Sequence, residues 1–298
     1  MERLYEFFVQ AGVRCKKNEP LAPHSSFRIG GAAELALFPE SRDEMMLCLS
    51  ALSAQNIKYA VIGNASNVVF PDEGIGGAVV FCGGWRELSI EGNTMTVSAG
   101  VSLAMAAAEA QRAGLAGLEF AHGIPATVGG AVVMNAGAFG GSMADVCVKT
   151  AYFDPADGKC HTLAGADHNF AYRNSFYKQH PQYTVLSATF ALTPDDGDAI
   201  AARMKDYIER RRSAQPLEYP SAGSVFNRPV GHFAGKLIED AGLKGTRIGG
   251  AEVSEKHAGF IINRGGATAK DVRELVALIK SRVFERFGVE LECEICFL

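Results

Sequence analysis

Three side chains in this sequence could take part in acid–base or anion chemistry. Ser224 follows a glycine and precedes a short predicted strand, which could hold its hydroxyl at a fixed point, although the pattern alone is more typical of a turn serine. It is not a GxSxG nucleophile elbow, because Ala222 and Phe226 occupy the glycine positions. Arg173 lies among aromatic residues, where it could contact a substrate anion or form a buried structural pair. Glu294 lies in a predicted terminal strand, where the default interpretation is a solvated carboxylate.

A glycine-rich segment, residues 123–141, could bind a flat ring or a phosphate through its main chain. Ten of its nineteen residues are Gly or Ala, and none is charged, so it is not a solvated linker. We do not expect a helix here, because Gly129, Gly130 and Gly137 would each destabilise one by about 1 kcal/mol. The composition favours a backbone that a ligand approaches closely, with free N–H groups. A run of tight turns between strands is the alternative.

A second small-residue loop, residues 62–67, follows a predicted buried strand. Its amides and backbone N–H groups could face a pyrophosphate, although neither GxGxxG nor a P-loop motif is present. Together the two segments suggest two backbone cradles around one extended dinucleotide. The candidate contacts are Gly63, Asn64, Ala65, Ser66, Asn67, Pro125, Thr127, Gly129, Gly130, Asn135, Ala136 and Gly137.

The elements that must position these residues indicate an α+β fold. We expect helices over residues 42–55, 102–113, 199–212, 233–241 and 269–287, the second capped by Ser102. Expected strands cover 59–62, 68–70, 79–82, 88–97, 149–153, 183–192, 258–263 and 289–295, with 79–82 and 88–97 in one meander. A change in character near Asp195 predicts a domain boundary there, and a subdomain boundary is expected near residue 75.

Composition excludes several classes of protein. The net charge is −4, with no basic cluster beyond residues 210–212, so we expect no nucleic-acid partner. No signal peptide and no apolar run of about 18 residues is evident, which predicts a cytoplasmic protein without membrane contact. The seven cysteines are an odd number, as expected for reduced thiols. Cys293 and Cys296 have CxxC spacing, but on the alternating strand expected there they would point to opposite faces. No histidine pair has metal spacing, so we predict no metal.

In this order, the segments resemble the UDP-N-acetylenolpyruvoylglucosamine reductase family. The resemblance extends from His24 to Glu294. Its most specific parts are Tyr172-Arg173-x-Ser175, the segment 220–226 (PSAGSVF) and the segment 249–263 (GGAEVSEKHAGFIIN).

The resemblance implies a flavoenzyme with non-covalent FAD and with NADPH as reductant. The fold would be an FAD-binding module of the vanillyl-alcohol-oxidase type over residues 1–195, followed by a smaller α+β substrate-binding domain over 196–298. Hydride would pass from the flavin to the methylene carbon of an enolpyruvyl UDP-sugar. Ser224 would then donate a proton to the adjacent carbon, while Arg173 stabilises the developing charge and Glu294 assists as a protonated acid. The implied substrate contacts are Tyr172, Asn227, Arg228 and His257. We expect a monomer in the cytoplasm, acting in peptidoglycan precursor synthesis.

The sequence departs from the family pattern at four positions. Ala65 and Ala126 replace usual glycines, and we expect the backbone to avoid positive φ there. Ala214 and Asn227 replace frequent lysines near the substrate phosphates. Arg211, Arg212 or Arg228 could supply the missing positive charge.

Two other functions fit the same resemblance less well. An FAD-linked oxidase or dehydrogenase on the same module would need no Ser224 or Arg173 motif. Such enzymes often bind flavin covalently through His or Cys, and His122 is the residue to test for such a bond. A non-catalytic nucleotide-binding regulator would have no reason to retain Arg173, Ser224 and Glu294.

Overall fold

The computed structural model describes residues 1–298, which divide into two compact units. The first unit contains residues 1–18, 34–64 and 76–210. The second contains residues 19–33, 65–75 and 211–298, so two short early segments fold with the C-terminal part of the chain.

The change of unit differs from the boundary expected near Asp195. Helix α7 (Gly197–Ala214) begins just after that position, and it buries Ile200 and Met204 in a core of the first unit. The chain therefore enters the second unit only at Arg211. The division of labour between residues 1–195 and 196–298 stays a prediction.

A four-stranded sheet with two helices forms one part of the first unit. Its strand order is β1-β2-β5-β3, and β3 and β5 run parallel. Helix α2 begins after Ser41, whose Oγ accepts a hydrogen bond from the Glu44 N–H at 3.2 Å. The elements are β1 (Cys15–Pro20), β2 (Ala32–Leu37), β3 (Tyr59–Ile62), β5 (Ile75–Phe81), α1 (Glu2–Gln10) and α2 (Arg42–Ala54).

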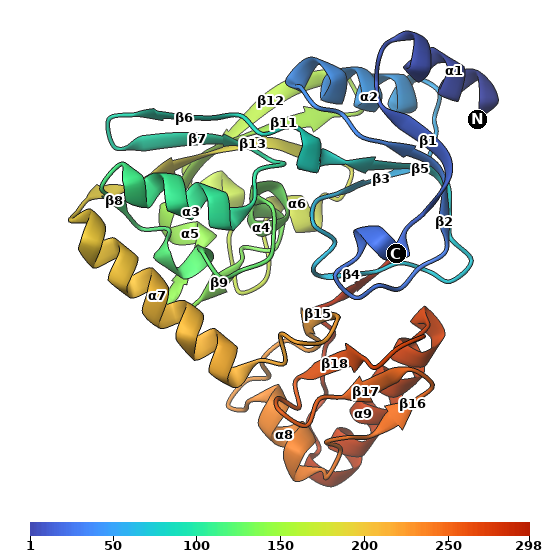
Figure 1. Ribbon diagram of the computed structural model, residues 1–298, viewed down its shortest axis with the longest axis vertical. Helices are drawn as coiled ribbons and strands as arrows, with labels where there is room; N and C mark the ends of the chain where they lie inside the picture. Colours follow the sequence, from blue (N-terminus) through green and yellow to red (C-terminus); the bar gives the residue numbers. More distant parts are fainter. The chain divides into compact units, whose positions relative to one another are not determined.

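A five-stranded antiparallel sheet forms the other part of the first unit, in the order β12-β11-β13-β7-β6. Its strands are β6 (Leu88–Glu91), β7 (Thr94–Ser98), β11 (Cys147–Asp154), β12 (Lys159–Ala164) and β13 (Thr184–Ala191). Helices α3 (Leu103–Arg112) and α4 (Val128–Val133) lie on one side of this sheet (Figure 1). The meander predicted for 79–82 and 88–97 is wrong, since β5 pairs in parallel with β3 and belongs to the other sheet.

Short elements connect these layers. They are α5 (Met143–Val146), α6 (Phe176–Gln179), the pair β8 (Leu115–Ala116) and β14 (Thr193–Pro194), the hairpin β9 (Gly137–Ala138) and β10 (Gly141–Ser142), and 3-10 turns at Cys82–Gly84, Glu119–Ala121 and Gly165–His168.

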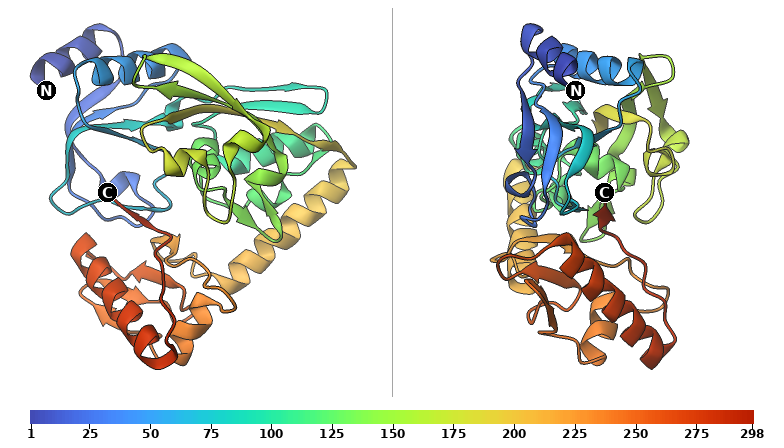
Figure 2. Two further views of the ribbon diagram at one scale, coloured as in Figure 1. Left: turned by 180° about the vertical axis from the view of Figure 1, so that it is seen from behind. Right: turned by 90° about the vertical axis from the view of Figure 1, so that its right-hand side faces the viewer.

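The second unit is a four-stranded sheet with two helices, in the order β15-β18-β17-β16. Its elements are β15 (Ser221–Ser224), β16 (Arg247–Ile248), β17 (Ala251–Val253), β18 (Phe260–Asn263), α8 (Ala234–Asp240), α9 (Ala269–Phe287) and a 3-10 turn at Ala22–His24. Helix α9, drawn in red-orange in Figure 2, buries its apolar face in the core of this unit, Val272, Leu275 and Ile279 included. Helices and mainly antiparallel sheets confirm the α+β class.

The C-terminal strand is shorter than predicted. Residues 289–295 form no continuous strand, and only Cys293 makes an isolated bridge, to Phe226. Strand β19 covers Cys296–Phe297 and pairs in parallel with β4 (Val68–Val69). The alternating pattern could not reveal this, because the partner strand lies far away in the sequence. No helix of the protein combines the length and apolar character that crossing a membrane requires.

Candidate active site

Gly63 and Asn64, in the first predicted cradle segment, contact the start of the second inside the first unit. A Cβ built on Gly63 would lie 2.2 Å from the Thr127 Oγ1, so only a glycine fits against this side chain. The Asn64 Nδ2 donates a hydrogen bond to the Pro125 carbonyl at 3.3 Å. The loop after β3 and the start of the glycine-rich segment are therefore neighbours, as one shared ligand would require.

The backbone N–H groups of Asn64, Ala65, Ser66 and Asn67 donate no hydrogen bond within the protein. Ala65 has a φ of +46°, so the expectation that its backbone avoids positive φ is wrong. At Ala126, in contrast, φ is not positive. A left-handed residue among successive free N–H groups is typical of an anion-binding nest.

The glycine-rich segment contains a short helix, contrary to the sequence prediction. Helix α4 begins after Thr127, whose Oγ1 accepts from the Gly130 N–H, and includes Gly129 and Gly130. The N–H groups of Val128 and Gly129 donate to the carbonyls of Val101 and Ala99, at 2.8 and 3.0 Å. A Cβ on Gly129 would lie 2.8 Å from that of Ala99, so close packing explains this glycine. The free amides expected here are absent from the first turn of α4.

Asn135, Ala136 and Gly137 follow α4 and also make internal contacts. The Ala136 N–H donates to the Ala131 carbonyl at 2.8 Å. A Cβ on Gly137 would lie 2.6 Å from the Gly141 carbonyl oxygen, which explains a glycine in this tight hairpin. Both polar groups of the Asn135 side chain are bonded to backbone.

Arg173 belongs to the first unit and faces the same segment. Its Nη2 donates to the Gly137 carbonyl at 3.2 Å, and its guanidinium lies 5.3 Å from the centre of the Tyr172 ring. Arg173 has a φ of +51°, and the Tyr172 side chain is 59% exposed. The Arg173 guanidinium thus contacts a backbone carbonyl and an aromatic face, and both alternatives from the sequence, an anion contact and a structural pair, stay open.

Ser224 and Glu294 come together within the second unit. Ser224 ends β15, and the Glu294 N–H donates to the carbonyl of its neighbour Val225 at 2.8 Å. The Ser224 hydroxyl makes one long hydrogen bond, 3.4 Å, to the Phe226 carbonyl. Gly223 has a φ of +80°, a conformation that suits glycine at this turn. The Ser224 hydroxyl is therefore held by only one long hydrogen bond, and the residue after it is bonded to the Glu294 backbone.

Asn67 connects its loop to the same segment. The Asn67 Nδ2 donates a hydrogen bond to the Glu294 backbone carbonyl at 3.1 Å. The Asn67 backbone carbonyl accepts one from the Cys296 N–H at 2.9 Å. The side chain thus fixes the backbone that carries Glu294. The sequence prediction of a cofactor contact at Asn67 missed this, because the two residues are 227 positions apart.

The predicted substrate contacts of the second unit differ in their surroundings. The Asn227 Oδ1 is buried without a hydrogen-bond partner in the protein, which is unusual for a native structure and leaves it free to accept one from a ligand. Arg228 stacks over the Phe233 ring at 3.9 Å, and its Nε donates to the His232 carbonyl. The His257 Nδ1 accepts from the Gly259 N–H at 3.1 Å. Burial lowers the pKa of His257 from its usual value.

Lys256 is a cation that sequence reasoning missed. Its Nζ donates to the Arg212 carbonyl at 2.7 Å and lies 4.0 Å from the Glu218 carboxylate. It therefore places a positive charge at Arg212, two residues before Ala214, where a lysine was expected. Arg211, another predicted source of positive charge, is largely shielded from solvent, and this burial lowers the pKa of its guanidinium. Lys256 lies inside the quoted GGAEVSEKHAGFIIN motif, which is the signal that could have found it.

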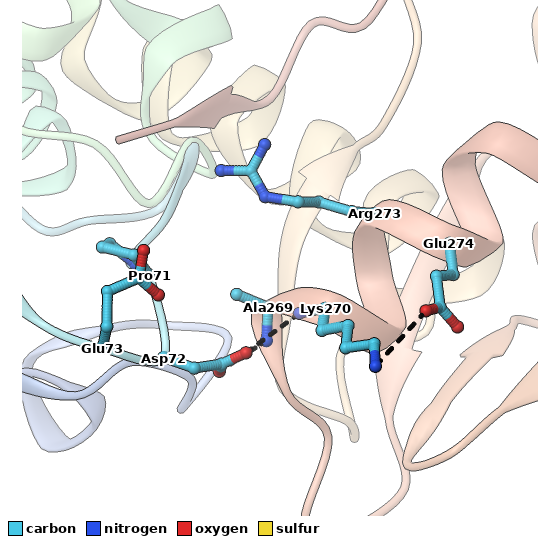
Figure 3. A pocket seen from close by; sticks show the side chains of 7 residues that line it. All are labelled: Pro71, Asp72, Glu73, Ala269, Lys270, Arg273 and Glu274. Atoms are coloured by element: carbon cyan, nitrogen blue, oxygen red, sulfur yellow. Dashed lines mark hydrogen bonds and ion pairs between the residues drawn. The ribbon is translucent and has the colours of Figure 1, made fainter.

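A pocket of about 200 Å³ in the second unit contains none of the predicted site residues. It lies beside the N-terminus of α9, where Asp72 accepts hydrogen bonds from the N–H groups of Ala269 and Lys270 at 2.7 and 3.0 Å (Figure 3). The carboxylate thus already satisfies the helix end. The N–H groups that line this pocket at the helix end are therefore bonded to Asp72, so the pocket is not a candidate for the active site.

The cysteines and one Asp/His cluster are the remaining groups of types that can take part in metal or redox chemistry. All seven cysteines are free thiols, Cys293 and Cys296 included. Asp154, Asp157 and His161 approach one another at the turn between β11 and β12, with the His161 Nε2 at 2.8 Å from Asp157. Exposed hydrogen bonds explain this cluster. The His122 Nδ1 is buried without a partner.

Comparisons with known proteins decide the family. Residues 215–298 match the model of the UDP-N-acetylenolpyruvoylglucosamine reductase C-terminal domain, and residues 33–164 match an FAD binding domain. The chain is 46% identical to the UDP-N-acetylenolpyruvoylglucosamine reductase of Moorella thermoacetica, over 96% of this chain and 95% of that one. It belongs to the UDP-N-acetylenolpyruvoylglucosamine reductase family.

Other members of the reductase family are similar over the same extent. The enzyme of that name from Streptococcus pneumoniae is 44% identical, over 100% of this chain and 97% of its own. The crystal structure of UDP-N-acetylenolpyruvylglucosamine reductase from Thermus caldophilus superposes with a TM-score of 0.80 at 37% identity, covering 96% of this chain and 98% of that one. The resemblance found in the sequence is confirmed, and so is an FAD-binding domain followed by a C-terminal domain.

Proposed function

We propose that this protein uses NADPH to reduce the enolpyruvyl ether of UDP-N-acetylglucosamine-enolpyruvate, giving UDP-N-acetylmuramate. Membership of the reductase family supports the reaction class. The observation that carries the assignment is the pairing of the Ser224 and Glu294 segments in the second unit, since the reaction needs a proton donor after hydride transfer.

The residues present fit FAD as the hydride carrier. Four successive N–H groups, from Asn64 to Asn67, have no acceptor in the protein, and Ala65 takes the left-handed conformation of an anion-binding nest. These N–H groups suit a pyrophosphate. Bound FAD would supply the hydride that the protein's own side chains cannot provide.

Ser224 is the proposed proton donor. Hydride addition to the methylene carbon leaves a basic, enolate-like centre on the adjacent carbon, which needs a proton. A serine hydroxyl is a weak acid in water, so it must be held close to this centre. The long bond to the Phe226 carbonyl leaves the Ser224 hydroxyl able to turn toward a substrate. When Ser224 gives its hydroxyl proton to the carbon, it becomes an alkoxide, which then regains a proton from solvent or from a neighbouring acid.

Arg173 and Glu294 are the other proposed catalytic residues. The Arg173 guanidinium would stabilise negative charge on the substrate carboxylate as the enolate forms. Its bond to the Gly137 carbonyl uses Nη2 and so orients the planar fork. Glu294 would assist proton delivery, and the Asn67 amide fixes its backbone.

The UDP-sugar would contact Tyr172, Asn227, Arg228 and His257. The unpaired Asn227 Oδ1 offers an acceptor to a donor group of the nucleotide. The diphosphate needs positive charge, which Ala214 does not supply. Lys256 and Arg228 are cations of the second unit that would supply it. We assign FAD mainly to residues 1–195 and the UDP-sugar mainly to residues 196–298, with Tyr172 as a substrate contact from the first of these ranges. We further infer a cytoplasmic monomer whose product serves peptidoglycan synthesis, and thus cell-wall formation, cell shape and division.

The test is NADPH oxidation by the purified protein with the enolpyruvyl nucleotide. We expect NADPH consumption that depends on this substrate and yields UDP-N-acetylmuramate, identified by mass. Consumption without conversion of the nucleotide would indicate an oxidase instead. Denaturation distinguishes the two further: FAD should separate from the chain, whereas flavin retained on His122 would contradict the proposal.

A further inference from the structure

Arg173 lies in a tight turn with an unusual backbone conformation. Ala171 and Asn174 exchange two backbone hydrogen bonds, of 3.0 and 3.1 Å, so Tyr172 and Arg173 are the central residues. The φ of Arg173 is +51°, which residues other than glycine, asparagine and aspartate rarely adopt. Such a conformation persists when the surrounding structure holds it, and it concentrates at functional sites.

Asn135 is bonded to this turn through its side chain. Its Nδ2 donates to the Ala171 carbonyl at 2.8 Å, and its Oδ1 accepts from the Ala144 N–H at 2.9 Å. The residue is 7% exposed and has a φ of +41°, which asparagine tolerates better than most residues. The amide therefore links the turn to the first residues of α5.

The same stretch supports the turn at two further points. Buried Ser175 donates from Oγ to the Val133 carbonyl at 2.7 Å. The Arg173 Nη2 donates to the Gly137 carbonyl, two residues beyond Asn135. Residues 133–137 thus contact the turn before, within and after Arg173. The Asn135 bond is the contact that reaches the turn's own first carbonyl.

We propose that Asn135 is a positioning residue for Arg173, and that its side chain does not serve as a flavin ligand. This inference rests on the proposed function only for the catalytic role of Arg173. The Asn135 amide already bonds to backbone on both its nitrogen and its oxygen. Loss of these bonds would let the turn relax and move the guanidinium away from its place beside the Gly137 carbonyl.

The test uses Asn135→Gly, because glycine keeps the positive φ and removes only the two side-chain bonds. FAD affinity and the rate of FAD reduction by NADPH should stay within about twofold of the wild type. Reoxidation of the reduced enzyme by the enolpyruvyl nucleotide should slow by about 10- to 100-fold, the usual effect of a misplaced catalytic group. Asn169→Gly is the matched control, since Asn169 also has a positive φ, of +47°, and its side chain bonds only the Gln179 side chain.

A double-mutant cycle distinguishes positioning from a separate structural role. If Asn135 acts through Arg173, adding Asn135→Gly to Arg173→Ala should slow reoxidation no further. The same tenfold loss in both backgrounds would overturn the proposal. Weaker FAD binding with normal reoxidation would also overturn it, because the side chain would then be a flavin ligand.

Amide exchange of the apoprotein separates this inference from the proposed function. Asn135→Gly should speed exchange of the Ala171 and Asn174 N–H groups relative to the wild type, whatever reaction the protein catalyses. Unchanged exchange would contradict the inference. Faster exchange with a kinetically silent Arg173→Ala would instead contradict the catalytic role of Arg173. Asn135→Asp, which keeps the acceptor for Ala144 but loses the donor to Ala171, gives the same test if the glycine variant does not fold.

Discussion

The Cα of Gly63 lies so near Thr127 that a methyl group on it would come within 2.2 Å of the threonine Oγ1. The loop after β3 and the cap of α4 therefore fit together only without a side chain at position 63. This contact joins two segments that are distant in sequence, both of which were predicted to face one dinucleotide.

Gly63→Ala should destabilise the protein and weaken FAD binding. Overpacking at such a contact costs about 1–3 kcal/mol. The change would displace Thr127 and with it the first turn of α4. Urea unfolding and FAD titration of the apoprotein measure the two effects. Gly83→Ala is the control, because a Cβ there meets nothing within 4 Å. Equal midpoints for the two variants would contradict the described packing.

Ser224→Ala should separate the two half-reactions. Reduction of FAD by NADPH should be unchanged, because it needs no proton from this hydroxyl. Reoxidation by the enolpyruvyl nucleotide should slow by about 10²- to 10⁴-fold, the usual contribution of a positioned proton donor. Stopped-flow absorbance of the flavin follows both steps, with exposed Ser89→Ala as the control. Wild-type reoxidation by the Ser224 variant would remove this residue from the mechanism.

Asp72→Ala should destabilise the second unit. The carboxylate accepts two N–H groups at the start of α9, and loss of such a cap costs about 0.5–2 kcal/mol. The Thr268–Asp271 capping box of the same helix remains and keeps the loss in this range. The shift of the urea midpoint measures it. Glu73→Ala, the next residue along the chain, should leave the midpoint nearly unchanged; an equal shift would mean that charge, and not capping, matters here.

His257 should make stability depend on pH. Burial lowers its pKa below the usual 6.5, and the neutral ring accepts the Gly259 N–H at Nδ1. The unfolded chain therefore binds this proton more readily than the folded protein. Stability from this residue is fully present above pH 6.5 and is lost as the pH falls through the lower folded pKa.

The measurement is the urea midpoint at pH 7.5 and 5.5. The wild type should lose more stability on acidification than His257→Gln, whose side-chain oxygen can accept the same N–H without titrating in this range. Parallel losses in the two proteins would show that His257 does not contribute.

Helix α9 and strand β3 could be predicted from local sequence signals. The range of α9 was predicted correctly, and a capping box at Thr268 and a left-handed Gly288 bound the helix. Strand β3 also matched. The helix α4 was missed because close packing of Gly129 on Ala99 outweighs the low helix propensity of glycine. Such compensation depends on tertiary contacts that no local pattern contains.

The candidate site shows the same limit. Residue types identified Arg173, Ser224 and Glu294 as candidates, and the resemblance gave them roles. The support that Asn67 gives to Glu294 and Asn135 gives to Ala171 could not be predicted, because each joins a side chain to a distant backbone carbonyl. A backbone acceptor leaves no signature in the type of residue that carries it.

The visible spectrum of the purified protein tests the central claim most directly. We expect the absorption of bound FAD, bleaching on anaerobic addition of NADPH, and return of the colour when the enolpyruvyl UDP-sugar is added. A colourless apoprotein that takes up no FAD on titration, or a bleached flavin that this nucleotide fails to reoxidise, would contradict the account.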